Sequence, residues 1–233
     1  MRPTALAPPR LPREEGRLLF RCAWERVVFL HYEVEPEALR PQVPFELDLF
    51  EGRAYVSLVA FTLRALRFSA GGPALATHEF LNVRTYVRGN GIYFLAEWLP
   101  HPLCVLLGPR LYGLPYRPGR LRYEHEPPLL RGRVEAAGGA LEYRARVRGP
   151  GRPAEGLEEF LVERYSAFTR RGAQACVFRV RHEPWILTPL EPEILDDRLI
   201  HGTGPWFRKA RFVGAHWSPG LDPVWMGRPR RLA

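Results

Sequence analysis

The order of apolar and polar residues along the chain predicts a protein built mainly of β-strands. Residues 54–68 (AYVSLVAFTLRALRF) are apolar on both faces at their centre, which is typical of a buried strand. Residues 78–99 alternate on either side of Gly89-Asn90-Gly91, whose residues accept positive φ angles. This second stretch is therefore predicted to form a β-hairpin.

Other segments complete the predicted secondary structure. Strands are expected over 17–34 (or a short helix leading into a strand), over 120–151 (two or three strands with a hairpin at Gly138-Gly139), over 175–185, and over 207–227 as a hairpin that turns at Ser218-Pro219-Gly220. Helical turns are expected over 35–44, ending before Pro41, and over 191–197. A short buried helix is expected over 101–113, and a helix over 153–168 from the spacing of Leu157, Phe160, Leu161 and Phe168.

This pattern favours an α+β fold in which the sheet is mainly antiparallel. Many short strands with frequent turn signals, together with a few helices, suggest one strand-rich barrel or sandwich with helices packed on it. The Pro- and Arg-rich residues 1–15 are expected to form a loose N-terminal arm, and residues 16–233 a single domain. The sequence contains no internal repeat and no recognisable linker.

The charge of the chain is strongly basic but has an unusual origin. The 233 residues carry a formal net charge of +9, with a pI of about 10.0, and Lys209 is the only lysine. A basic protein more often binds nucleic acid, an anionic substrate or an acidic membrane. The preference for Arg is also what a GC-rich genome produces. The 24 prolines suggest a thermophilic source, since proline stiffens loops.

Cysteine usage and hydropathy indicate the compartment. Cys22, Cys104 and Cys176 are an odd, dispersed set without the CxxC spacing of metal sites, so free thiols in a reducing cytosol are expected. The first residues lack the apolar core of a signal peptide, and no apolar run has the length of a bilayer span. We therefore expect a cytoplasmic protein without a membrane partner.

Standard catalytic and binding motifs are missing from the sequence. His78-Glu79 begins like a zinc-protease helix, but Asn82 stands where the second histidine is required, so we expect no metal and no cofactor. Arg144, Arg146 and Arg148 alternate along one strand and could contact phosphates. A solvated strand face explains the same alternation better, so nucleic acid is not the favoured partner.

A set of polar residues lies within the apolar strands. A charged side chain on such a strand needs a partner or a cavity, and the interior of a barrel offers one. Each residue taken alone is explained as well by a structural hydrogen bond, but together they favour one polar pocket. The set is His31, Glu79, Asn82, Arg84, Tyr93, Tyr116, Glu163, Arg164 and His182.

Several motifs in order along residues 20–225 resemble the YqjF-like family of uncharacterised proteins. They include EFLNVRTYV, LYGLPYR, LEEFLVERYSAF and HEPWIL. That family is similar in fold to acetoacetate decarboxylase, and the resemblance implies an acetoacetate-decarboxylase-like, partly closed antiparallel β-barrel with flanking helices.

The similarity to the decarboxylase also concerns the chemistry. Gly113-Leu114-Pro115-Tyr116-Arg117 matches the spacing of the stretch that supplies the Schiff-base lysine in that enzyme, and it has Tyr116 at the lysine position. A phenol cannot form an imine. Glu79 is the residue that resembles a glutamate of the decarboxylase site. Lys209 could replace the missing lysine only if the last segment entered the pocket, and its arginine neighbours favour a solvated face instead.

Three functional hypotheses follow. The leading one is a pocket for a carboxylate or keto-acid-like anion held by Arg84 and Arg164, with Tyr116 as hydrogen-bond donor or general acid and with Glu79 and His31 as proton-transfer or orienting groups. The remaining expected lining residues are Asn82, Tyr93, Arg117 and His182. Binding without turnover and catalysis without a Schiff base both stay open. The alternatives are an interaction protein with a solid core and an arginine-mediated nucleic-acid binder. Under any of the three hypotheses, edge strands would be compatible with a homodimer.

Overall fold

The computed structural model describes residues 18–232, and strands make up most of that range. The strands are β1 (Leu18–Val34), β2 (Ala54–Phe68), β3 (Ala76–Val87), β4 (Gly91–Leu99), β5 (Tyr116–Pro118), β6 (Arg120–Glu124), β7 (Leu129–Ala136), β8 (Gly139–Val147), β9 (Arg152–Pro153), β10 (Ser166–Arg171), β11 (Gln174–Arg181), β12 (Ile186–Asp196), β13 (Arg211–Gly227) and β14 (Arg230–Arg231). The helices are α1 (Pro36–Leu39), α2 (Pro102–Tyr112), α3 (Leu157–Val162) and α4 (Arg198–His201), with 3-10 helices η1 (Arg40–Gln42) and η2 (Pro205–Lys209).

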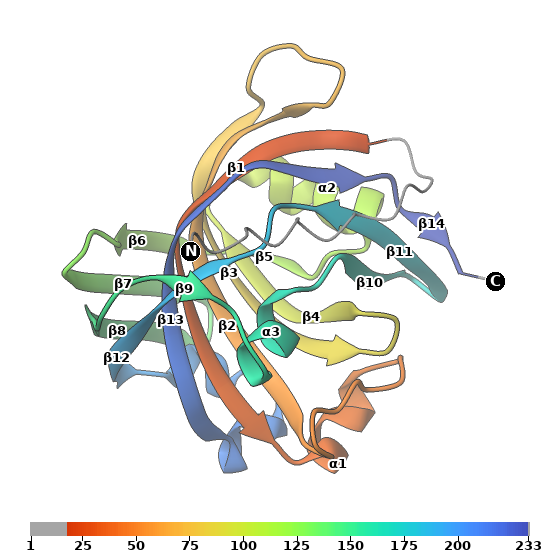
Figure 1. Ribbon diagram of the computed structural model, residues 1–233. Coiled ribbons are helices and arrows are strands. Elements are labelled where there is room, and N and C mark those ends of the chain that lie inside the picture. The colour runs from red at the N-terminus through yellow and green to blue at the C-terminus, as the bar shows by residue number, and fades with distance from the viewer. Residues whose placement is uncertain (1–17, 233) are drawn as a thin grey trace, which may run out of the picture.

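Seven of the strands follow one another around a ring (Figure 1). Their order is β11-β10-β4-β3-β2-β1-β13, and a short pairing of β13 with β11, Val180 with Met226 and Arg181 with Trp225, brings the ends together. Neighbours in the ring are antiparallel except for β4 and β10, which are parallel. The prediction of a mainly antiparallel α+β fold is confirmed. The closed part is a ring of strands and not a true barrel.

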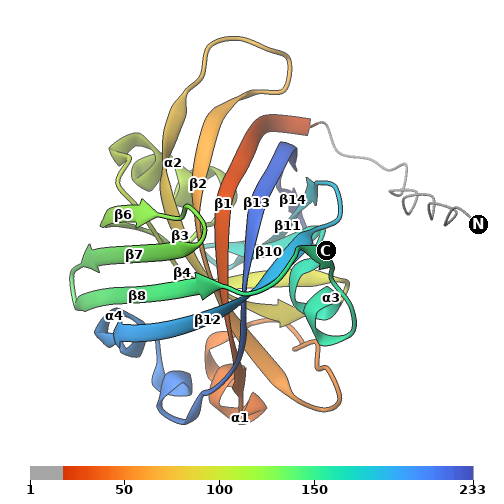
Figure 2. The same cartoon turned by 60° about the vertical axis from the view of Figure 1, so that its left-hand side comes forward.

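A second layer extends from the ring. Strands β12, β8, β7 and β6 continue the fourteen-stranded sheet from β13, and Figure 2 shows them running across the long strands β1 and β13. Alternate residues of β1 consequently serve two cores: Val28 and Leu30 pack outward against this layer, whereas Val27 and Phe29 point into the ring. The interior of the ring is therefore a separate core, and it contains most of the polar residues that the sequence places within apolar strands.

Several predicted elements are confirmed. The segment 17–34 is a strand over its described residues, the hairpin of β3 and β4 turns at residues 88–90, and β7 and β8 form the hairpin at Gly138-Gly139. The helix α1 ends at Leu39, and a 3-10 turn then includes Pro41. The predicted arm over residues 1–15 lies outside the described residues.

Three predicted elements are wrong, in each case because pairing with a distant strand determines the conformation. The helix expected over 153–168 ends at Val162, since β10 pairs with both β4 and β11. The helical turn expected over 191–197 belongs to β12, which pairs with β8. Tertiary contacts of this kind override weak local preferences.

The hairpin expected over 207–227 is the third error, since β13 is one continuous strand there. Gly220 does not turn the chain but allows a close approach to β1. Its φ is +114°, and a Cβ on it would lie 1.9 Å from the carbonyl oxygen of Trp24. The register of β1 and β13 is irregular in this region, as expected of a bulge that increases strand curvature.

The helix α2 also departs from its expected environment. It forms within the predicted segment 101–113 but is not buried: Leu103, Leu106, Leu107 and Leu111 are all exposed. It covers the end of the ring at which β1 begins and β13 ends (Figure 1). Among the described residues, no helix has both the length and the apolar character that crossing a bilayer requires.

Candidate functional site

A cavity of about 90 Å³ lies in the core inside the ring. Most of its wall is apolar, with rings such as Phe29, Phe61, Phe80 and Trp185. The polar side chains on the wall come from elements that are distant in sequence. They are His78, Asn82, Arg84, Glu97, Tyr116 and Arg164, with His182 beside Trp185.

Three of these side chains form one row across adjacent strands. Glu97 on β4 pairs with Asn82 on β3 on one side and with Tyr116 on β5 on the other. Asn82 and Glu97 are 6% and 2% exposed, and neither Asn82 Oδ1 nor Glu97 Oε2 has a hydrogen-bond partner among residues 18–232. Unpartnered buried polar atoms are rare and call for an explanation. The row therefore presents unused hydrogen-bonding capacity to the cavity.

A β-bulge places Glu97 on this face. Near the turn the hairpin pairs Arg84 with Phe94, but beyond an irregularity it pairs Val83 with Ala96 and Asn82 with Glu97. Because side chains alternate between faces, one extra residue in β4 moves every later side chain to the opposite face. Glu97 is a polar residue within an apolar segment of the sequence. Without the bulge, however, its side chain would lie on the opposite face of β4 and would not face Asn82.

Burial sets the protonation of this row. Enclosure raises the pKa of the Glu97 carboxyl well above its usual value, because the charged form loses its hydration. Burial first and then the neighbouring Glu97 raise the pKa of the Tyr116 phenol in the same way. A raised pKa favours the neutral, protonated form of each group, in which it has a proton to donate.

Arg84 contributes a charge that has no counterion in the described part of the chain. The side chain is 6% exposed; Nη2 donates to the carbonyl oxygen of Leu161 at 3.1 Å, and the buried Nε has no acceptor within residues 18–232. The guanidinium also lies 6.0 Å from the ring of Phe29. Among the ion pairs of the described chain none includes Arg84, although arginine stays charged in proteins.

Arg164 is held differently. Its Nη1 donates to Asp48 at 2.6 Å and its Nε to the carbonyl oxygen of Phe160 at 2.5 Å. The guanidinium also lies 4.0 Å from the ring centre of Phe160 and 5.1 Å from that of Tyr86. Arg164 thus has its counterion in place, so the uncompensated positive charge of the site belongs to Arg84.

His182 borders the cavity among aromatic rings. It stacks on Tyr165 with ring centres 4.7 Å apart, and its Nδ1 contacts the carbonyl oxygen of Glu183 at 2.8 Å. Burial lowers the pKa of His182, so the ring is neutral near pH 7. Glu163 does not line the cavity, because its carboxylate accepts from the backbone N–H of Trp185 at 2.7 Å and from the Tyr165 hydroxyl.

The comparisons with known proteins can be set beside this geometry. The model of the DUF2071 family, described as an uncharacterized conserved protein, matches residues 21–222. The chain belongs to the DUF2071 family. It is similar to the uncharacterized protein YqjF of Bacillus subtilis (strain 168), with 30% identity over 192 residues that cover 77% of this chain and 79% of that protein.

Solved structures with a similar fold include acetoacetate decarboxylases. That of Legionella pneumophila has a TM-score of 0.65 at 14% identity and covers 100% of this chain and 98% of its own. An acetoacetate decarboxylase-like enzyme from Sphingomonas wittichii RW1 gives 0.64 at 15% identity, covering 98% and 99%. The enduracididine biosynthesis enzyme MppR, complexed with pyruvate, gives 0.63 at 14% identity, covering 98% and 92%. This DUF2071 protein therefore has an acetoacetate-decarboxylase-like fold.

Five of the site residues expected from the sequence come together on the cavity wall of this DUF2071 protein: Asn82, Arg84, Tyr116, Arg164 and His182. Four others lie outside it. Glu79 is on the opposite face of β3 from His78, Tyr93 packs on Phe45 at 5.6 Å, and the exposed Arg117 lies 5.4 Å from the ring of Trp98. Neighbours on a strand point to opposite faces, which accounts for Glu79 and Arg117.

His31 is the fourth, and it belongs to a different buried network. Its Nδ1 contacts Ser57 Oγ at 2.7 Å, and Ser57 in turn contacts the Tyr86 hydroxyl. Burial, followed by the nearby His216 and Arg84, lowers the pKa of His31 well below its ordinary value. His31 lines a separate groove with His216. Lys209 is exposed on η2.

Within residues 18–232, no group of three or more His, Cys, Asp or Glu side chains is arranged to hold a metal ion. The described cysteines are all free thiols, of which Cys104 lines the cavity. The arrangement that the site does offer is a buried cation on one side and neutral hydrogen-bond donors on the other.

Proposed function

We propose that the interior cavity binds a small carboxylate of the keto-acid type and that no Schiff base forms with it. Arg84 holds the carboxylate in this proposal. The neutral Glu97 and Tyr116 face the carbonyl oxygen, and Asn82 lies between the two ends on β3.

The unpaired charge of Arg84 is the observation that carries the proposal. An isolated charge in a protein interior is strongly unfavourable unless an opposite charge and hydrogen bonds compensate it. The buried Nε of Arg84 has no acceptor among residues 18–232, and the cavity lies beside it. A ligand carboxylate supplies both the negative charge and the acceptors, in the planar geometry that suits a guanidinium.

The other end of the cavity suits a carbonyl group. A carbonyl oxygen accepts hydrogen bonds, and both a phenol and a protonated carboxyl donate them. At the position of Tyr116 imine formation is chemically excluded, and Lys209 is exposed on η2. Polarisation of the carbonyl by neutral donors is the chemistry that these residues can supply.

The size of the cavity limits the ligand. The volume of about 90 Å³ is several times the roughly 10–15 Å³ that a cavity needs to hold a single water, so there is room for a small molecule. Pyruvate and acetoacetate are within this size, and pyruvate is the molecule named with the similar fold of MppR. The open volume beside Arg84 and Tyr116 favours a binding site over the alternative of an interaction protein whose core is solid.

Calorimetric titration with acetoacetate and with pyruvate tests the proposal. The wild-type protein should bind them, and Arg84→Gln should weaken binding at least about thirtyfold, because losing one partner of a buried charged pair costs about 2 kcal/mol or more. Glutamine keeps a donor for the carbonyl oxygen of Leu161, so the fold is expected to survive.

Two controls make this titration specific. Arg117→Gln removes an exposed arginine next to Tyr116 that does not line the cavity, and it should leave affinity unchanged. The methyl ester of acetoacetate has the same carbonyl without the charge and should bind weakly to both proteins. Equal affinity of wild type and Arg84→Gln for the acid would contradict the proposal.

A further inference from the structure

The helix α2 has an apolar stripe that faces outward. Leu103, Leu107 and Leu111 follow one another at intervals of four residues, which places them on one side of the helix. They are 61%, 44% and 50% exposed, whereas the residues of α2 that are buried are Gly108 and Tyr112. A surface helix normally turns its apolar stripe toward the core, so this stripe requires a separate explanation.

The stripe forms one wall of a groove of about 260 Å³. Phe20, Leu66 and Leu75 lie on other parts of the wall, and apolar atoms make up nearly all of its surface. Leu75 is itself 46% exposed, in the segment between β2 and β3 that projects at the top of Figure 1. Apolar surface gathered in a groove, unlike scattered apolar residues, marks a binding site.

The groove adjoins the interior cavity. Five residues line both: Leu66, Cys104, Leu114, Tyr116 and Met226. Tyr116 thus stands at the boundary, with the polar row of Asn82 and Glu97 on one side and the leucine stripe on the other. Gly108 lies against the ring of Tyr116, since a Cβ on it would be 2.3 Å from Cδ2.

We infer that the ligand is amphipathic: a carboxylate head in the interior cavity carries an aliphatic tail that lies in the groove along α2. This inference rests on the function proposed above and names its ligand class as medium- to long-chain acids. A tail is the expected occupant of the groove because the groove adjoins the cavity that contains Arg84. One molecule with a charged head and an apolar chain would fill both spaces.

A homologous series of ligands tests this inference. Butyrate, hexanoate, octanoate, decanoate and dodecanoate are titrated into the full chain, with dodecanol as a ligand that has the tail and lacks the charge. Affinity should rise about fourfold for each methylene group that the groove covers, and then level off when the groove is filled. Dodecanol should bind more weakly than dodecanoate.

Substitutions on α2 locate the tail. Leu107→Gln and Leu111→Gln alter exposed groove residues, so the fold should be kept, and they should reduce the gain per methylene while leaving butyrate affinity unchanged. Leu106→Gln is the matched control: it is equally exposed on the same helix but lines a different depression, and it should keep the full gain.

The outcomes separate the two proposals. Equal affinity for butyrate and dodecanoate would overturn the tail site and leave the anion site standing. Failure of every acid to bind, with acetoacetate and pyruvate included in the same titration, would overturn the proposed function, and this inference with it. A dimer in sedimentation that dissociates on Leu107→Gln would assign the leucine stripe to a second copy of the chain and would also overturn the inference.

Discussion

At the residue scale, the candidate site is defined by three buried polar atoms that have no hydrogen-bond partner among the described residues: Arg84 Nε, Asn82 Oδ1 and Glu97 Oε2. Leaving one such group unsatisfied costs about 1–3 kcal/mol, and more when it is charged. The summed cost of three such atoms around one cavity is a large fraction of the free energy of unfolding of an ordinary domain. Their retention is understandable if a ligand satisfies them.

The buried Glu97 makes stability depend on pH. Its folded-state pKa is raised, so the folded protein holds a proton that the unfolded chain releases above about pH 4.3. The free energy of unfolding is therefore not reduced by Glu97 below that pH. It falls as the pH rises toward the raised pKa, by at most about 1.4 kcal/mol per pH unit.

Glu97→Gln should remove this dependence, because glutamine is neutral at every pH and has nearly the same shape. In urea unfolding the stability of the variant relative to wild type should increase between about pH 5 and about pH 7. Surface carboxylates titrate equally in both proteins, so their contribution cancels when the free energy of unfolding of wild type is subtracted from that of the variant. Parallel pH profiles would show that Glu97 is ionised in the folded protein.

Much of the site can be found from the sequence, since Asn82, Arg84, Tyr116, Arg164 and His182 stand out as polar residues in apolar segments. Glu97 is equally polar in an apolar strand and was missed. Whether it faces the cavity depends on the bulge in β4, and a bulge has no clear signature in a strand that contains no glycine at that point. His31 and Glu79 were placed wrongly for a similar reason. Whether each side chain reaches the cavity depends on how its strand pairs with strands that are distant in the sequence.

At the element scale, the packing of α2 on β5 determines the position of Tyr116. Gly113, with a φ of +73°, ends α2 in the left-handed conformation that suits a helix C-terminus, and β5 begins three residues later. Gly108 permits the ring of Tyr116 to lie against the helix. The position of the phenol therefore depends on one glycine within a helix, where alanine would otherwise be preferred.

Gly108→Ala tests this packing. The added Cβ must displace the Tyr116 ring, and overpacking of this kind costs about 1–3 kcal/mol, against about 1 kcal/mol gained from helix propensity. A net destabilisation of up to about 2 kcal/mol is expected in urea unfolding. In a Tyr116→Ala background the obstacle is gone, so the same change should become stabilising. A stabilising effect in both backgrounds would contradict the assigned contact.

The errors among predicted elements share one cause. Residues 166–171 and 191–196 have local patterns compatible with helix, but the ring and the second layer each provide a strand edge to which they pair. Hairpins with strong turn signals, such as the one at residues 88–90, are predictable because their partners are adjacent in sequence. Pairings between distant strands are not encoded locally.

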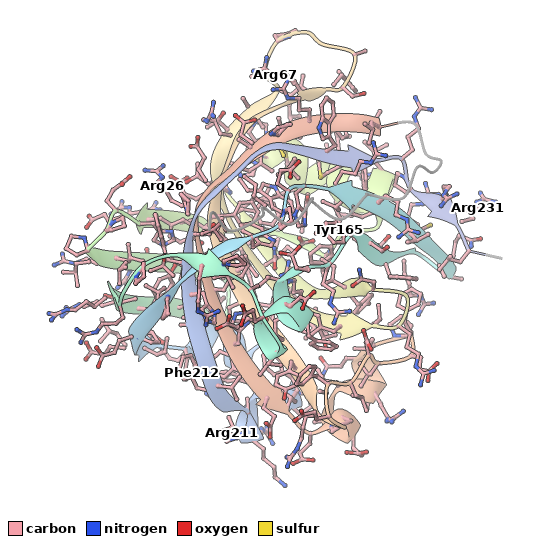
Figure 3. The ribbon with its side chains drawn as sticks, viewed as in Figure 1. Arg26, Arg67, Tyr165, Arg211, Phe212 and Arg231 are labelled. Carbon is pink, nitrogen blue, oxygen red and sulfur yellow. The ribbon has the colours of Figure 1, made fainter. Side chains whose placement is uncertain are left out.

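At the scale of the whole molecule, some exposed arginines lie far apart from one another on the surface. Figure 3 shows Arg26, Arg67, Arg211 and Arg231 at four different edges of the molecule. Arg26 pairs with Glu126 at 3.0 Å and Arg211 with Glu33 at 2.5 Å. Exposed pairs of this kind contribute little to stability, whereas Arg84 inside the ring has no carboxylate partner within the range that the structure describes.

The second layer bears on the nucleic-acid hypothesis. Arg144 and Arg146 on β8 are exposed, but their partners on the neighbouring β12 are Glu193 and Glu191, and Arg148 forms an ion pair with Glu191. Alternating charges of both signs are typical of a solvated strand face rather than of a surface that follows a phosphate backbone. The expectation that nucleic acid is not the partner remains a prediction.

The most direct test of the central claim is a crystal structure of the protein grown with acetoacetate. The account predicts density for the ligand inside the ring, with its carboxylate within hydrogen-bonding distance of Arg84 Nε and its carbonyl oxygen facing Tyr116 and Glu97. A structure in which Arg84 pairs with a carboxylate of the protein, and in which the interior holds no ligand at a saturating concentration of acetoacetate, would contradict it.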